Sequence, residues 1–181
     1  MKTYLTYGFL LALANAILTL IFYLLGFHSD PEKLRLAQIV AAIASPVITI
    51  TGLVLGMRAR RAAAPATEEF SYGRALGAGM MVTLFAALFG TIFYYVYLRF
   101  INPDFTDVIM QAETAKLEAK GVSGAKLEQA QNFMRMFLQP GMQIVVGFIG
   151  TVIWGTVISL VAAAFVKRPA LPPATPVTPA A

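Results

Sequence analysis

The chain has 181 residues, enough for one compact domain and at most a small second one. Apolar residues make up 58% of it and charged residues 13%, against about 45–50% and about 25% in soluble domains. Because so few charges could not cover the surface of a soluble protein, the composition excludes an ordinary soluble domain. It predicts a membrane protein. The formal net charge of +5 is explained by membrane topology, as shown below, and we expect no nucleic-acid partner.

The residue types that carry most metal and redox chemistry are scarce. With no Cys and a single His, His28, the sequence excludes disulfides, thiol catalysis, thiolate-bound zinc and a histidine metal cluster. No HExxH or Walker sequence occurs either. We therefore expect a protein that is not an enzyme, with no catalytic residues, no cofactor and no metal. His28 stands at a loop edge, where we expect it to be solvated or interfacial.

Four apolar stretches each exceed the roughly 20 residues that a helix needs to cross about 30 Å of hydrocarbon. None contains Asp, Glu, Lys, Arg or His. They predict an all-α polytopic membrane protein with four transmembrane helices, near residues 4–27, 36–57, 75–98 and 142–166. For the first stretch a signal peptide is the alternative, because Ala14-Asn15-Ala16 resembles a cleavage site. The apolar run continues to Leu25, beyond the usual length of about 7–15 residues, so we expect the stretch to be retained.

The positions of Lys and Arg predict the orientation of these spans. Arg58, Arg60 and Arg61 directly follow the second span, and Lys167 and Arg168 directly follow the fourth. Most bases between the third and fourth spans lie deep within a segment of about 40 residues, where the positive-inside rule has little force. Both termini are therefore predicted to be cytoplasmic, and the whole net charge falls on that side.

The loops carry helix signals. Residues 29–32, Ser-Asp-Pro-Glu, predict a cap with Pro31 at the first helical position. Residues 67–69, Thr-Glu-Glu, predict the start of a helix that leads into the third span. Phe70 and Tyr72 are typical of the interfacial aromatic belt.

Residues 104–139 predict an extracytoplasmic amphipathic helical hairpin, with Asp104 or Thr106 capping its first helix. Gly121–Gly124 separates its two helices, Ser123 is expected to cap the second, and Pro140-Gly141 to end it. Such a hairpin can pack on itself, lie on lipid, cover the end of the other helices, or bind a protein partner or a second copy of the chain. We expect contact with membrane lipids or self-packing rather than a partner.

Small residues in the fourth span predict close helix packing. They recur at every fourth position, which gives a groove that another helix backbone can approach, within a four-helix bundle or in a second copy. These residues are Gly147, Thr151, Gly155, Ser159 and Ala163.

Polar side chains in the spans allow a second interpretation. Asn15, Thr49, Thr83 and Thr151 could together line a small polar cavity. Hydrogen bonding between helices is the simpler interpretation of such residues. After the four-helix transmembrane domain, residues 1–168, the tail of residues 169–181 holds five of the ten prolines and no charge, which predicts disorder.

Two segments are similar to a known family. They are Phe70-Ser71-Tyr72-Gly73-Arg74-Ala75 with Asn102-Pro103-Asp104-Phe105, and Lys120-Gly121-Val122-Ser123 through Leu127-Glu128-Gln129-Ala130 to Phe137-Leu138-Gln139-Pro140-Gly141. The chain resembles, over about residues 1–168, a family of small bacterial four-helix membrane proteins known only as a domain of unknown function. The resemblance implies a bacterial inner-membrane location and the same four-span layout. It implies no activity and no functional residues.

Two function classes follow. The first is a non-enzymatic accessory or self-associating subunit that acts through helix packing, because a small-residue groove and an amphipathic hairpin occur without a reactive constellation. The second is a small transporter or channel for a neutral or lipophilic solute. A polar cavity at mid-membrane depth favours the second class, and a closed, dry bundle favours the first.

Overall fold

The described part of the protein, residues 1–170 of a computed structural model, is all-α. The predicted tail, residues 169–181, lies almost wholly outside these residues. In chain order the elements are α1 (Lys2–Leu24), α2 (Pro31–Ala62), α3 (Tyr72–Val96), the π-helical turn η1 (Tyr97–Ile101), α4 (Phe105–Ala119), α5 (Ala125–Leu138) and α6 (Pro140–Val166).

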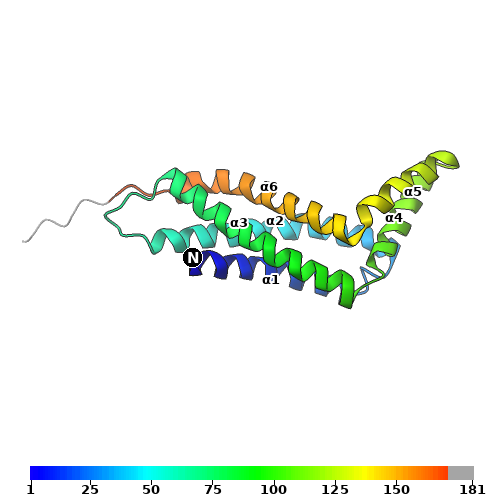
Figure 1. The fold of residues 1–181 in the computed structure, drawn as a ribbon, viewed down its shortest axis with the longest axis horizontal. Helices are drawn as coiled ribbons and strands as arrows, with labels where there is room; N and C mark the ends of the chain where they lie inside the picture. The colour runs from blue at the N-terminus through cyan, green and yellow to red at the C-terminus, as the bar shows by residue number, and fades with distance from the viewer. Residues whose placement is uncertain (171–181) are drawn as a thin grey trace, which may run out of the picture.

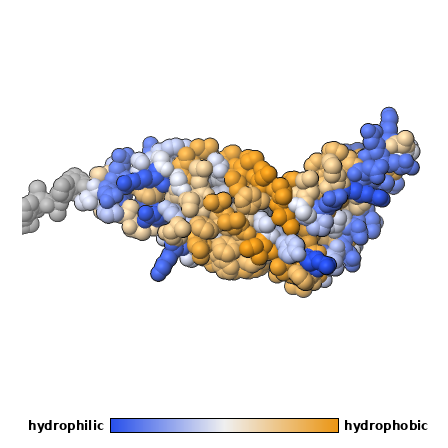
Figure 2. Space-filling view, viewed as in Figure 1, coloured by the Kyte–Doolittle hydropathy of each residue, from blue (hydrophilic) through white to orange (hydrophobic). Residues whose placement is uncertain are grey.

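Four helices are long and apolar enough to cross a membrane, which confirms the four predicted segments. They are Lys2–Leu24, Pro31–Ala62, Tyr72–Ile101 and Pro140–Val166. The first ends a few residues before its apolar run does, because Gly26 turns the chain with a positive φ of 76°. Their surfaces form the broad apolar band in Figure 2, and polar residues gather beyond it at both ends. This surface is compatible with a membrane protein.

Helices α1, α2, α3 and α6 lie side by side and form what we call the four-helix body (Figure 1). Residue 1 and the end of α6 lie at the same end of the body. Two contacts join its elements there: Arg60 Nε donates to Tyr4 Oη at 2.9 Å, and Arg61 Nη1 donates to the Val166 carbonyl at 3.2 Å. Helices α4 and α5, the hairpin, project from the opposite end (Figure 1).

Helices α2 and α3 each begin after a residue whose side chain caps the helix, but α3 begins later than the sequence predicted. Asp30 caps α2 by accepting from the Glu32 amide at 2.9 Å, and Pro31 is the first helical residue, as expected. The prediction that residues 67–69 start a helix is wrong, because α3 begins at Tyr72 after the cap Ser71.

Phe70, two residues before α3, pairs with Arg168, which lies just after the end of α6. Phe70 and Arg168 form a single antiparallel bridge through two hydrogen bonds of 2.9 Å. Phe70 is therefore buried, 3% exposed, and the prediction that it is interfacial is wrong. Tyr72 is 40% exposed, and its hydroxyl donates to the Leu160 carbonyl at 3.0 Å.

Residues 104–139 form two helices that pack on one another, as predicted, but their ends differ from the prediction. Gly124, with a φ of 60°, precedes α5 in place of Ser123, because the turn needs a positive φ that serine rarely adopts. Pro140 starts α6 instead of only ending α5. Phe105 and Val108 anchor α4 to the body, whereas α5 has no buried residue.

Small residues bring α3 and α6 into close contact in the half of the body away from the hairpin. A Cβ atom on Gly79 would lie 2.5 Å from Ser159 Oγ, and one on Gly155 would overlap the side chain of Thr83. Around these contacts lie Val82 and Met57, which are fully buried. Because lipid offers no hydrophobic drive between helices, this backbone-level packing holds the four-helix body together if it spans a membrane.

Two glycines of α3 test this packing. Gly79→Ala should lower the free energy of unfolding by about 1–3 kcal/mol, because the added methyl overpacks against Ser159. Gly77→Ala, two residues away, meets no atom within 4 Å and should leave stability unchanged or raise it by up to about 1 kcal/mol. Reversible unfolding of the purified variants in mixed detergent measures both. Equal stability of the two variants would contradict the packing described.

Candidate functional site

A cleft of about 720 Å³ lies in the half of the four-helix body nearer the hairpin. All four helices of the body contribute to its wall, which is mostly apolar. Its described lining contains no Asp, Glu, Lys or Arg. Among the lining residues are Asn15, Thr19, Ser45, Thr49, Tyr94, Phe148, Thr151 and Trp154.

The contacts between the helices indicate that the cleft opens between α2 and α6. At its level the other neighbouring helices are joined. Asn15 and Ser45 join α1 to α2, Tyr94 and Gln143 join α3 to α6, and the rings of Tyr23 and Tyr97 join α1 to η1, which continues α3. No described hydrogen bond joins α2 to α6 there. Helix α2 has no buried residue between Ala37 and Leu53, and α6 has none before Gly155.

The cleft ends next to the contact between Gly155 and Thr83, and neither of these two residues lines it, so its floor lies just above this contact. Thr83 is 2% exposed, and its hydroxyl oxygen has no hydrogen-bond partner among the described residues. Below this contact α6 is packed: Ser159 and Ala163 are fully buried. Above it α6 has no buried residue, so the cleft begins where the close packing of α6 ends.

The structure divides the predicted small-residue groove at this floor. Gly155, Ser159 and Ala163 lie in the packed half, whereas Gly147 and Thr151 are exposed and line the cleft. A Cβ atom on Gly147 would meet nothing within 4 Å. The spacing of every fourth residue continues through both halves, so no signal in α6 alone marks where its partner helix leaves.

The predicted polar set is also divided. Asn15, Thr49 and Thr151 line the cleft, but Thr83 lies beneath it because Gly155 covers it. Thr49 and Thr151 donate to carbonyls of their own helices, Ser45 and Gly147 respectively, each at 2.8 Å. These hydroxyls therefore present oxygen lone pairs to the cleft.

Asn15 and Ser45 form the polar link between α1 and α2. Ser45 Oγ donates to Asn15 Oδ1 at 2.7 Å, and Asn15 Nδ2 donates to the Leu11 carbonyl at 3.1 Å. The carbonyl contact fixes which end of the amide carries the NH₂ group. No sequence signal marks the pairing of Ser45 with Asn15, which are 30 residues apart.

A buried polar cluster closes the cleft at the hairpin end. His28 Nδ1 and Tyr97 Oη lie 2.6 Å apart, and Asn102 Nδ2 donates to Tyr97 Oη at 2.9 Å and to the His28 carbonyl at 3.2 Å. The ring of Phe105, at the start of α4, lies 4.5 Å from the His28 ring, centroid to centroid. The hairpin is thus attached to the residues that roof the cleft.

His28 is 7% exposed, so the expectation that it is solvated or interfacial is wrong. Phe22, Tyr97 and Phe105 surround its ring. Burial lowers the pKa of His28 below its ordinary value of 6.5, because the charged imidazolium loses its hydration. At neutral pH the cleft therefore has an uncharged roof.

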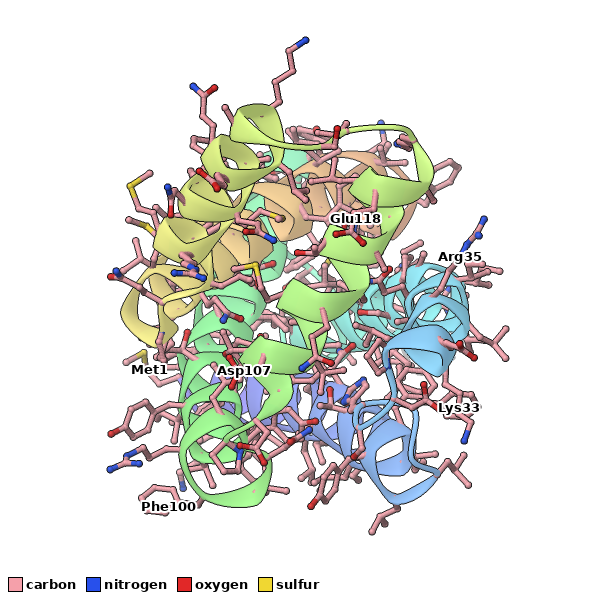
Figure 3. The ribbon with its side chains drawn as sticks, turned by 90° about the vertical axis from the view of Figure 1, so that its right-hand side faces the viewer. Met1, Lys33, Arg35, Phe100, Asp107 and Glu118 are labelled. Carbon is pink, nitrogen blue, oxygen red and sulfur yellow. The ribbon has the colours of Figure 1, made fainter. Side chains whose placement is uncertain are left out.

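The π-helical turn η1 sets the positions of Tyr97 and Asn102. The Asn102 amide donates to the Tyr97 carbonyl at 2.8 Å, five residues earlier, which places both side chains on His28. Single π-helical turns are frequent at functional sites. Figure 3 views this end of the molecule: α4 crosses in front of the body, while Lys33 and Arg35 at the start of α2 point outward.

A further contact ties the hairpin to the cleft wall. Tyr94 Oη donates to Gln143 Oε1 at 2.7 Å, and Gln143 Nε2 donates to the Leu138 carbonyl at 2.7 Å. One residue thus connects α3, the end of α5 and the start of α6.

No three His, Asp or Glu side chains within residues 1–170 gather closely enough to hold a metal ion.

Residues 6–168 match the family model described as "Protein of unknown function (DUF4199)". The chain belongs to this family. The resemblance to a domain of unknown function is therefore confirmed, whereas the bacterial origin that it implied stays a prediction. Comparisons with curated proteins and with solved structures gave no match.

Proposed function

We propose that this chain is an integral protein of a bacterial inner membrane, with cytoplasmic termini and an extracytoplasmic hairpin, that binds a neutral lipophilic molecule in its cleft. The cleft between α2 and α6 carries the proposal. It has about 720 Å³ of space, a mostly apolar wall and a few polar side chains, which is the usual composition of a ligand site. Its open side would face lipid, so a lipophilic molecule can enter from the bilayer without crossing water.

The orientation rests on charge. Arg58, Arg60 and Arg61 belong to the same end of the body as residue 1 and Val166, and the positive-inside rule favours the cytoplasm for such an end. The hairpin end has as many acids as bases and includes no comparable cluster at a helix terminus.

Transport of the bound molecule, by a small carrier or channel, is the natural extension of ligand binding in the cleft.

A reporter active only outside the cytoplasm tests the orientation. Fused at Gly121, in the turn between α4 and α5, it should be active, and fused after Arg168 it should be silent. The positions of Lys and Arg relative to the span ends predict that the two sites lie on opposite sides of the membrane. Activity after Arg168 and silence at Gly121 would contradict the proposed orientation.

A self-associating or accessory subunit without catalysis is the second candidate. One observation favours it: the small residues Gly147 and Gly150 of α6 are exposed, so the backbone of a helix from a second copy could approach them. The hairpin offers another surface, since Phe133 and Phe137 are exposed and their ring centroids lie 4.8 Å apart. We propose a non-enzymatic role in either case.

Native mass spectrometry separates the two candidates. The wild-type protein should retain a neutral lipophilic adduct. If the role is non-enzymatic, the mass of the bound molecule should be the same before and after incubation with the protein. Thr151→Phe should lower the retained fraction about tenfold, which corresponds to about 1.4 kcal/mol of binding free energy, because the larger side chain fills space that the ligand would occupy. Ile149→Phe, on the exposed face of the same helix and outside the cleft lining, is the matched control and should retain the adduct.

The same spectra report the number of chains per particle. A wild-type dimer that Thr151→Phe converts to a monomer, with no adduct in either, would favour the self-associating subunit. Equal adduct retention by Thr151→Phe and Ile149→Phe would contradict ligand binding in the cleft.

A further inference from the structure

We propose that the polar residues at the floor of the cleft, Asn15, Ser45 and Thr151, recognise an uncharged hydrogen-bond-accepting oxygen on the bound molecule. The ligand class is then a lipophilic compound whose carbonyl or hydroxyl oxygen enters first, and not a phospholipid tail. This inference rests on the proposed function and goes beyond it by naming what the cleft selects.

Asn15 supplies the donor. An amide NH₂ group carries two hydrogens, and the Leu11 carbonyl takes one of them at 3.1 Å. No other acceptor among the described residues bonds to Asn15 Nδ2, and Asn15 lines the cleft. Because Ser45 Oγ holds Asn15 Oδ1, the amide cannot rotate to satisfy the second hydrogen elsewhere without breaking a 2.7 Å bond. A ligand oxygen at the floor can accept it.

Ser45 and Thr151 supply acceptors from two other helices that line the cleft, α2 and α6. Each hydroxyl already donates, Ser45 to Asn15 and Thr151 to the Gly147 carbonyl, so lone pairs are what remain for a ligand. A ligand hydroxyl could accept from Asn15 and donate to one of these oxygens, and a ligand carbonyl could use Asn15 alone. A carboxylate would need a counter-charge, and the described lining contains no Lys or Arg.

The depth of this polar level excludes a phospholipid as the best-matched occupant. Asn15, Ser45 and Thr151 lie 9, 14 and 11 residues from the hairpin ends of their helices, Leu24, Pro31 and Pro140, or about 14–21 Å along the axis at about 1.5 Å per residue. If the helices span a bilayer, that is near the midplane of its roughly 30 Å hydrocarbon layer. Phospholipid chains end there in methyl groups, which would leave the Asn15 N–H unpaired in an apolar medium.

The single tryptophan gives a direct readout. Trp154 lines the cleft one turn from Thr151 and is the only Trp in the chain. In nanodiscs of phosphatidylcholine with brominated acyl chains, chains in the cleft add to the quenching of Trp154, which is 53% exposed, and a ligand that displaces them restores that part of its fluorescence. The probes are dodecan-2-one and dodecane, compared at equal mole fraction in the bilayer, because they differ in one carbonyl.

Dodecan-2-one should restore the fluorescence at an about threefold to tenfold lower mole fraction than dodecane, the ratio expected for one net hydrogen bond. Asn15→Leu should abolish the difference between the two probes. Thr19→Val should keep it: Thr19 lines the cleft one turn away on α1, but its hydroxyl is used by the Asn15 carbonyl at 3.0 Å. The comparison of probes in the wild type needs no variant, so a poorly folded Asn15→Leu protein does not remove the test.

Each other outcome overturns the inference in a distinguishable way. Equal recovery with both probes in the wild type would leave lipophile binding intact but remove recognition by the polar floor. A carbonyl preference that persists in Asn15→Leu would place the recognising group elsewhere. No recovery with either probe would mean that the cleft does not take these lipophiles, and the proposed function would fail together with the inference.

Discussion

The contact between the Thr83 side chain and the bare backbone of Gly155 sets the level at which the helices of this protein separate. On one side of it, Gly79, Ser159 and Ala163 let α3 and α6 pack at backbone distance. On the other side, α6 continues with the same small residues, but neither α6 before Gly155 nor α2 between Ala37 and Leu53 has a buried residue. If the small residues of α6 were closely packed along the whole helix, there would be no room for a cleft. The cleft therefore depends on where this packing stops.

The open half still needs contacts that keep it open and ordered. Polar links supply them at two levels: Asn15 with Ser45 near the floor, and His28 with Tyr97 and Asn102 at the roof. In an apolar surrounding an unpaired polar group is costly, so each link holds its helices at a defined separation. The roof also attaches the hairpin, because Phe105 packs on His28. A change in the hairpin's position would therefore reach the cleft through the residues that close it.

The apolar runs and the helix signals that act locally could be predicted from the sequence. Four runs without a charge specify four long helices, and Asp30 with Pro31 starts α2 through chemistry within three residues. Errors arose where a distant partner decides the local structure. Residues 67–69 do not start a helix: the Glu68 amide donates to the Pro65 carbonyl in a turn, and the bridge of Phe70 to Arg168 follows it. His28 is buried by Phe105, which lies 77 positions later in the chain.

The candidate site shows the same division. Asn15, Thr49 and Thr151 were placed in one polar group by residue type alone, and all three line the cleft. Thr83 has the same residue type and a similar helical position but lies below the floor, since only the packing of Gly155 decides on which side it falls. Tyr97, Asn102 and Gln143 were missed as site residues because each acts through a partner on another element. The η1 turn that positions two of them has no evident sequence signal.

Spin-label distances between α2 and α6 test the central claim most directly. The chain has no Cys, so pairs of introduced cysteines can be labelled cleanly. One pair, at Ile43 and Ile149, reports the half near the hairpin, and the other, at Leu55 and Val161, reports the packed half; all four positions are exposed. In lipid nanodiscs the first pair should be clearly farther apart than the second. Equal distances at the two levels would show that α2 and α6 run together along their whole length, and the cleft would not exist in the membrane.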